Sequence, residues 1–566
     1  MRTKRLRSVA PLVAVCVLAG ACAVACSGGG SGGTGGDGAT PRKIALIDIN
    51  AKPADQVKDG GTLRYAIDQW VPQWNQLQVD GALQVADEPE SAIFPRMFRS
   101  DDKGDVEPNP DFLSDASVVQ KKPKQAVTYT INPKAKWSNG DPITWKDFAA
   151  QWKAMRGTDS RYQVASTTGY ERIDAVKKGS DDRTVHVTFD KPFGEWLKLF
   201  DPLYPAKYTS DPDKFNNAYR EKIPETAGPF KVSKIDKTSQ SVTLVRDPKW
   251  WGTRPKLDSI VFRSMDDSAM PGAFANGEID YAPIGADASA YKQATGVKGA
   301  QVRKAAGPDY RTLTFGRSGA FTDVKVRQAV AMGINRQAIA TADLQGLDWP
   351  IRTMDNHFFV NTQAGYRDNA GMTGTFNQNR AKQTLDGLGW KPGTGGVRTK
   401  GGKQLTVDMV IPSGTPASKN EAEIVQTMLK DIGVKLDIRS VSSNDFFNKY
   451  VMPGDFDLAP FSWIGTPFPI ADAKSIYGTP KGDDPQQNFG RIGSEKADKL
   501  MDKAQSELNV QQARADMNEA DNLIWSIAHS LILYQRPQYT AVKANLANIG
   551  SWGFQSRNFA TVGFTK

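Results

Sequence analysis

Residues 310–339, which read YRTLTFGRSGAFTDVKVRQAVAMGINRQAI, constrain the fold more than any other stretch. An apolar strand containing Leu313 and Phe315 leads into a glycine-containing turn. A helix is expected to begin at Thr322 or Asp323, because both are good N-cap residues. The apolar positions follow the spacing of one buried helix face: Val326, Ala329, Val330, Gly333 and Ile334. An ordinary core helix would give the same local pattern. Because strands and turns precede this unit and a strand-and-helix alternation follows it, we expect one globular unit to pass into another here.

The length and the cysteine pattern limit the possible architectures. A chain of 566 residues is too long for one core and predicts two or three domains. Its three cysteines, Cys16, Cys22 and Cys26, all lie in the first 26 residues, so the body has no disulfide, cysteine-based zinc site or cysteine nucleophile. Only three histidines occur, far apart in sequence, and no metal site is predicted. The net charge of +10 is spread along the chain, which argues against nucleic-acid binding.

The N-terminus has the pattern of a secretory signal peptide. Basic residues are followed by an apolar segment, residues 9–21, that is too short for a lasting membrane span. Small residues precede both Cys22 and Cys26, which resembles a bacterial lipobox, although neither has leucine at the usual position. We expect residues 1–25 to be removed, Cys26 (alternatively Cys22) to be acylated, and the glycine-rich residues 26–59 to form a flexible linker. Plain signal cleavage is the other interpretation. A lipid anchor predicts a location on the cell membrane, facing outside the cytoplasm.

The body carries five short motifs in a fixed order. They are WSNGDPITWKDF, TAGPF, RDPKWWG followed by PKLDSIVFR, FANGEID, and LTFGRSGAFTDVKVRQAVAMGINRQAI. Within the first, Thr144 and Asp147 have the spacing of a capping box that opens a helix through Trp152. Strands are expected at residues 60–67 and 127–131 from their alternating patterns. Taken together, the motifs resemble those of the family 5 solute-binding proteins of ABC importers, the oligopeptide-, dipeptide- and nickel-binding group.

The resemblance implies an α/β fold of the two-lobed periplasmic-binding-protein type (class II, cluster C). Two crossing strands would join the lobes, with hinge residues Arg311, Thr312 and Leu313, and residues 323–339 would form the first helix of the second lobe. The implied first lobe combines residues 60–87, 202–307 and 535–566. The implied inserted domain is 88–201, and the implied second lobe is 308–534.

The family's ligand lies between the lobes, where a Trp-x-x-Asp element holds a peptide's α-ammonium group. Trp463 matches this element, but Thr466 stands at the aspartate position, and a hydroxyl cannot supply the charge. Asp472, six residues on, is a possible substitute. The candidate ligand-binding residues form three groups: Trp463, Gly465 and Thr466; Trp70, Trp74 and Asn75; and Asn356, His357 and Phe358. For each group the alternative role is packing or a lobe rim.

Two functional hypotheses follow. The first is a monomeric lipoprotein receptor that captures a small ligand, most simply an oligopeptide, and delivers it to an ABC permease; a sugar or glycolipid fragment would also suit aromatic walls. The second is a regulatory lipoprotein that kept the fold and acts in cell-envelope glycolipid synthesis, as in an actinobacterial branch that this chain resembles. The body after residue 60 has neither a G-x-S-x-G nor an H-E-x-x-H motif, so we expect no enzyme activity and no cofactor.

Overall fold

A ten-stranded mixed sheet runs through the fold in the computed structural model, which describes residues 44–482 and 485–566. The predicted leader and its lipidation residues Cys22 and Cys26 lie outside the described residues. From edge to edge the strands are β17 (Lys435–Val441), β16 (Thr406–Pro412), β18 (Leu458–Trp463), β12 (Ala300–Phe315), β19 (Ser530–Lys543), β11 (Tyr281–Pro283), β1 (Thr62–Ile67), β10 (Ser259–Ser264), β9 (Ser241–Arg246) and β8 (Phe230–Asp236). Strand β1 confirms the strand expected at residues 60–67.

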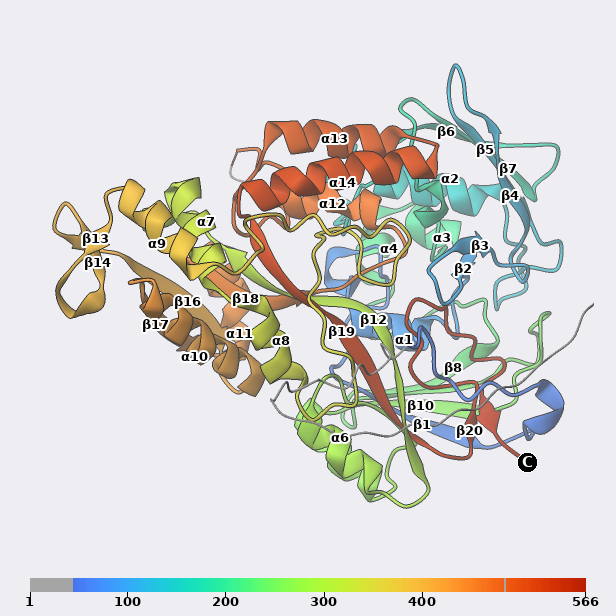
Figure 1. The fold of residues 1–566 in the computed structure, drawn as a ribbon. Helices are drawn as coiled ribbons and strands as arrows, with labels where there is room; N and C mark the ends of the chain where they lie inside the picture. The colour runs from blue at the N-terminus through green and yellow to red at the C-terminus, as the bar shows by residue number, and fades with distance from the viewer. Residues whose placement is uncertain (1–43, 483–484) are drawn as a thin grey trace, which may run out of the picture. The chain divides into compact units, whose positions relative to one another are not determined.

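The two long strands β12 and β19 belong to both halves of this sheet (Figure 1). They pair antiparallel from Ala300 opposite Lys543 to Thr314 opposite Ser530. The strands on one side of the pair come from the predicted second lobe, and those on the other side come from the predicted first lobe. The structure therefore contains the two crossing strands that the family resemblance implies.

The ladder between the crossing strands is irregular at one point. Ala306 pairs with Pro537 and Tyr310 pairs with Gln535, so residues 307–309 lie opposite Arg536 alone. Proline has no backbone N–H to donate to a ladder, and Pro308 and Pro537 both lie here. A second register shift falls between Arg311 and Thr312, within the predicted hinge.

Two helices follow β12 where a single helix was expected over residues 323–339. Asp323 is the N-cap of α7 (Val324–Gly333), as predicted, and its side chain accepts a hydrogen bond from the Lys325 amide. The helix ends at Gly333, and α8 (Arg336–Leu344) begins after Asn335, whose side chain accepts from the Ala338 amide. The prediction of one continuous helix was wrong, because the side chain of Asn335 starts a new helix at this point.

The predicted inserted domain contains its own sheet and core. Its strands, in order across the sheet, are β4 (Leu113–Gln120), β5 (Ala126–Ile131), β7 (Thr184–Phe189) and β6 (Ile173–Lys178), and α2 (Trp145–Met155) packs nearby. The predicted capping box of α2 is confirmed: Thr144 accepts from the Lys146 amide, and Asp147 accepts from the Thr144 amide. A hairpin of β2 (Phe98–Ser100) and β3 (Val106–Pro108) leads into this sheet.

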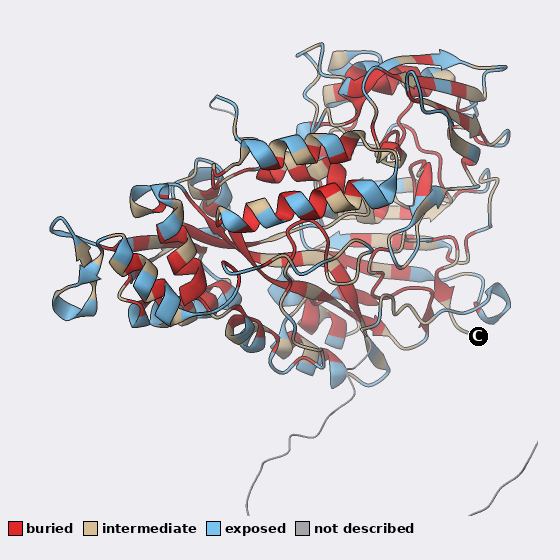
Figure 2. Ribbon diagram, turned by 45° about the horizontal axis from the view of Figure 1, so that its top comes forward, coloured by how far each residue is buried: buried red, intermediate tan, exposed pale blue. Residues whose placement is uncertain are grey.

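The remaining elements cover the sheets, with their buried faces turned inward (Figure 2). Helices α12 (Pro469–Tyr477), α13 (Glu495–Ser506) and α14 (Val510–Ser526) pack together around one apolar cluster. The other helices are α1 (Asp87–Glu90), α3 (Ala206–Thr209), α4 (Pro212–Asn217), α5 (Met270–Ala275), α6 (Ala288–Thr295), α9 (Gln378–Gly387), α10 (Pro416–Asp431) and α11 (Ser443–Asp445). The small strands are β13 (Lys391–Pro392), β14 (Arg398–Lys400), β15 (Lys403–Gln404), β20 (Leu546–Ala547) and β21 (Gly563–Phe564). In the part of the chain that the structure describes, no helix has the length and apolar character to cross a membrane.

Candidate ligand-binding site

A cavity of about 590 Å³ lies where the two crossing strands meet both predicted lobes and the inserted domain. Its volume falls within the range of about 300–1,000 Å³ that is common for small-ligand sites. The walls come from residues 307–309 of β12, residues 536–539 of β19, residues 464–468 after β18, residues 553–560 near the C-terminus, and side chains of the inserted domain that include Arg96, Phe98, Asp111, Lys198 and Asp201.

Two of the predicted ligand-binding residues, Gly465 and Thr466, line this cavity. A Cβ atom on Gly465 would lie 2.1 Å from the carbonyl oxygen of Pro308, so only glycine fits where this loop meets the crossing strand. The Thr466 hydroxyl accepts from the Phe468 amide at 3.1 Å. This contact holds the Thr466 side chain against its own loop.

Trp463 lies beside the cavity loop but is not among the cavity-lining residues. Its ring stacks on Phe489 with 5.7 Å between centroids and meets Phe461 edge-on at 5.4 Å. Trp74 and Asn75 are buried in the core of the predicted first lobe. The side chain of Asn75 donates to the Phe215 carbonyl at 2.9 Å. Trp74 and Asn75 therefore belong to this core and not to the lining of the cavity.

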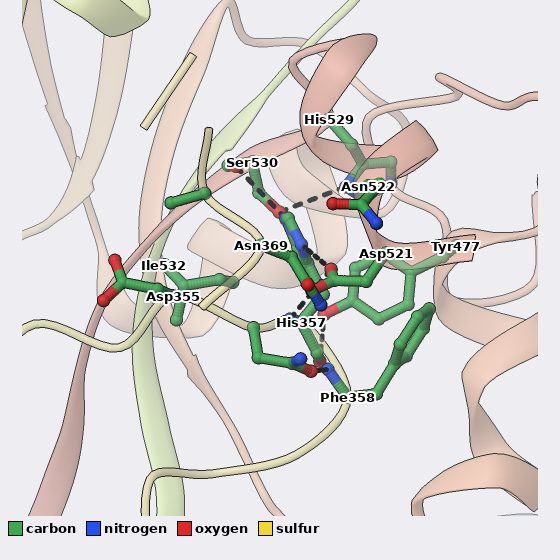
Figure 3. A network of polar contacts seen from close by, with 12 residues as sticks. Asp355, His357, Phe358, Asn369, Tyr477, Asp521, Asn522, His529, Ser530 and Ile532 are labelled. Carbon is green, nitrogen blue, oxygen red and sulfur yellow. Dashed lines mark hydrogen bonds and ion pairs between the residues drawn. The ribbon is translucent and has the colours of Figure 1, made fainter. Parts of the chain in front are cut away.

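Trp70 is half-buried at the edge of the same core, and its ring meets Trp74 edge-on at 6.2 Å. Asn356, His357 and Phe358 form a buried cluster. Figure 3 shows His357 and Phe358 beside Tyr477. His357 Nδ1 lies 2.7 Å from Asp521 Oδ1, and its Nε2 lies 3.3 Å from the Ser530 carbonyl oxygen. The Asn356 side-chain oxygen accepts from the Phe358 amide. This group therefore holds a loop onto α14 and does not line the cavity.

Asp472, the suggested substitute for the missing aspartate, already has a cationic partner. Lys198 of the inserted domain forms an ion pair with it. Asp472 is also outside the lining of the cavity. The structure therefore gives Asp472 a role in joining the inserted domain to α12.

Further contacts tie the inserted domain to α12 and α13. Glu195 accepts hydrogen bonds from the backbone amides of Ile470 at 3.3 Å and Ala471 at 2.6 Å, in the first turn of α12. Arg172 donates to the Gln505 side chain at 2.6 Å. Burial raises the pKa of Glu195 to about 8; the Ala471 amide opposes this rise. The segments that were predicted as the inserted domain and the second lobe are thus in contact beside the cavity.

One wall of the cavity is an ionic network that the sequence did not reveal. Asp87 pairs with Arg96 and, at 2.9 Å, with Arg557, which also bonds Glu88 at 2.6 Å. Burial acts to raise the pKa of Asp87, but the charges of Arg96 and Arg557 outweigh it and lower the pKa. Because these partners lie up to 470 residues apart in the chain, no local pattern could have identified the network.

Two further charged residues that the sequence did not reveal lie at the irregular point of the crossing strands. Asp309 and Arg536 both line the cavity. The Asp309 Oδ1 atom is buried and has no hydrogen-bond partner. Cationic and anionic groups thus line one cavity, which suits a small molecule that carries both charges. Among the described residues, no cluster of three or more His, Cys, Asp or Glu side chains is placed to hold a metal ion.

Comparison with known proteins gives a consistent assignment. A family model described as "Bacterial extracellular solute-binding proteins, family 5 Middle" matches residues 107–482. The oligopeptide-binding protein OppA of Mycobacterium tuberculosis is 38% identical over 524 residues, which cover 92% of this chain and 87% of that protein. The probable monoacyl phosphatidylinositol tetramannoside-binding protein LpqW of the same species is 25% identical over 358 residues, covering 58% of this chain and 55% of that protein.

The fold is also found among solved structures. The periplasmic EDTA-binding protein EppA superposes with a TM-score of 0.84 and 27% identity, covering 93% of this chain and 100% of that one. The predicted two-lobed α/β architecture is confirmed by this likeness together with the crossing strands. The chain therefore belongs to the bacterial extracellular solute-binding proteins of family 5.

Proposed function

We propose that this protein captures an oligopeptide in the cavity between its lobes and delivers it to an ABC permease. The observation that carries the proposal is the cavity itself, which is lined by the crossing strands, the 464–468 loop and charged side chains of the predicted inserted domain. A peptide offers an ammonium group, a carboxylate and a polar backbone, and the cavity presents charges of both signs to match them. The similarity to an oligopeptide-binding protein over most of the chain supports the same ligand class.

The proposed mechanism is capture by closure. The two crossing strands allow the lobes to rotate about them, as in hinge-bending binding proteins. The contacts of Glu195, Lys198 and Arg172 with α12 and α13 would form as the lobes come together. A permease could then distinguish the closed, loaded receptor from the open one. We further propose that acylation at Cys26, or at Cys22, holds the receptor at the outer face of the membrane.

Native mass spectrometry of the purified protein, followed by calorimetry with a defined peptide pool, tests the ligand class. We expect co-purified peptides, and dissociation constants in the micromolar range or below for individual members. A protein that carries no peptide and shows no heat with any pool would refute the proposal. Labelling cells with an alkyne-tagged fatty acid, with Cys26→Ser and Cys22→Ser as paired variants, tests the anchor.

A second candidate function is the binding of a mannosylated phospholipid or its headgroup in cell-envelope glycolipid synthesis. The similarity to the tetramannoside-binding protein is the observation that favours it. The same mass spectra decide between the two, because a bound glycolipid would appear as a single large mass shift and bound peptides as a distribution. Adjacent permease and ATPase genes would favour import, and an isolated gene would favour the glycolipid role.

A further inference from the structure

Asp309 differs from the other carboxylates that line the cavity. It lies in the segment 307–309, where the ladder between the crossing strands is interrupted. Its Oδ1 atom is buried and has no hydrogen-bond partner. The other cavity-lining carboxylates are Asp87, Asp111 and Asp201, and none of their oxygen atoms is buried without a partner in the described part of the chain.

A buried carboxylate oxygen without a partner is unfavourable, because the charge loses its water and gains nothing in return. Native structures rarely keep such an atom unless a function or a missing partner accounts for it. Asp309 lines the cavity, so a molecule in that cavity can supply the partner. The unpaired oxygen is therefore evidence of what the ligand carries.

Two nearby groups offset part of the cost of burying the Asp309 charge. Burial raises the pKa of Asp309, whereas the charge of Arg536 and the backbone amide of Gly465 act to lower it. Arg536 lines the same cavity, and its charge acts on the Asp309 carboxylate. Among the described residues, no group donates a hydrogen bond to the buried Oδ1 atom of Asp309.

The other carboxylates near the loop are already engaged. Asp87 holds two arginines, Arg96 and Arg557. Asp472 pairs with Lys198. Asp201 accepts from the Phe98 amide at 3.5 Å, and burial raises its pKa to about 6. Among the described carboxylates that line the cavity, Asp309 is therefore the one with a buried oxygen to which a cationic group of a ligand could donate a hydrogen bond.

We propose that the Asp309 carboxylate accepts hydrogen bonds from a primary ammonium group of the ligand. The identity of that group as a peptide's α-ammonium rests on the proposed function. Asp309 lies next to Gly465, and the neighbouring Pro308 packs against the Gly465 backbone. Asp309 therefore lies beside the loop that contains Thr466, which supplies no charge. The crossing strand would thus provide the charge that residue 466 lacks.

The test compares free and N-acetylated forms of one short peptide identified by mass spectrometry. Acetylation removes the ammonium charge and leaves the rest of the peptide unchanged. Calorimetry is done with the wild-type protein, Asp309→Asn, and the control Asp437→Asn, which changes an exposed aspartate of β17 outside the lining of the cavity. We expect acetylation to weaken binding to the wild type on the order of 100-fold, as expected when one partner of a buried charge pair is removed. Asp309→Asn should bind the free peptide on the order of 100-fold more weakly and lose the preference for the free amine, whereas Asp437→Asn should keep both the affinity and the preference.

The melting temperature of the ligand-free protein provides a second readout. Removing an unpaired buried charge should leave the melting temperature of Asp309→Asn unchanged or higher than that of the wild type. A lower melting temperature, with equal losses for both forms of the peptide, would assign Asp309 a structural role and overturn the inference. Wild-type binding that is indifferent to acetylation would overturn it too, while leaving the proposed function intact. A wild type that binds no peptide would refute the proposed function and this inference with it.

Discussion

Replacing Glu195 by glutamine should remove a pH dependence from lobe closure. Glu195 caps the first turn of α12 across the contact between the inserted domain and the second lobe. Burial raises its pKa to about 8 from an ordinary value of 4.5; the Ala471 amide and Lys198 act to lower it, and Asp472 acts to raise it. Opening the lobes would return Glu195 to water and restore the ordinary pKa.

The two pKa values of Glu195, about 8 in the closed form and 4.5 in water, decide the direction of the pH effect. Because the closed form has the raised pKa, closure takes up a proton over the window from about pH 4.5 to about pH 8. The stabilisation of the closed form is fully present below pH 4.5 and is lost as the pH rises through 8. One proton changes the equilibrium by at most tenfold per pH unit, or about 1.4 kcal/mol. The Glu195 side chain is only part-buried, and solvent screening therefore reduces the pH effect below this maximum. We expect ligand affinity to fall on the order of tenfold from pH 6 to pH 8.

Two measurements check this prediction. Calorimetry with a bound peptide at pH 6, 7 and 8, in buffers of different ionisation heat, gives both the affinity and the number of protons taken up. Because residues 27–566 contain no cysteine, Ser239→Cys and Lys419→Cys can carry a fluorophore pair that reports closure of the ligand-free protein. Glu195→Gln should show a flat pH profile, and Glu423→Gln, an exposed control on α10, should keep the wild-type profile. Parallel profiles for wild type and Glu195→Gln, or affinity that rises with pH, would refute the reasoning.

Three further predictions concern packing, a buried ion pair and a helix cap. Gly465→Ala places a Cβ atom 2.1 Å from a carbonyl oxygen of the crossing strand and should weaken ligand binding at least about tenfold, whereas Gly387→Ala, with open space around it, should bind normally in the same titration. Arg311→Met breaks the bidentate pair of Arg311 with Glu421, whose two hydrogen bonds measure 2.5 and 2.7 Å. Because Glu421 is then left as a buried charge without its partner, the free energy of unfolding in urea titrations should fall by about 3–5 kcal/mol. A loss below about 1 kcal/mol would contradict this. Asp323→Ala removes the cap of α7 and should cost about 1 kcal/mol by the same measurement, with unchanged ligand affinity.

The buried cluster of Asn356, His357 and Phe358 shows why sequence reasoning failed at part of the site. A histidine between an asparagine and aromatic residues has the composition of a ligand pocket. A polar cluster in a protein core has the same composition. The structure shows such a core cluster, in which His357 lies against Asp521 (Figure 3). Only the packing of α14 against that loop separates the two alternatives.

Features that depend on neighbours in the chain could be predicted before the fold was known. Two of them are helix caps, the Thr144–Asp147 capping box and the Asp323 cap, in which a side chain contacts nearby backbone. The third is the alternating apolar pattern of β1. In each case the spacing is visible within one segment of the sequence. The five motifs in order likewise gave the family and its crossing strands. Gly465 and Thr466 were found because they follow Trp463, which matches the family's Trp-x-x-Asp element.

Tertiary structure alone decided which charges face the cavity. Asp309 comes within the influence of Arg536, which is more than 200 residues away in the chain, only because β12 and β19 cross side by side. Arg557 reaches Asp87 from the far end of the chain. Such partners obey no sequence spacing, since the distance between them is set by how strands and lobes pack and not by the number of residues that separate them.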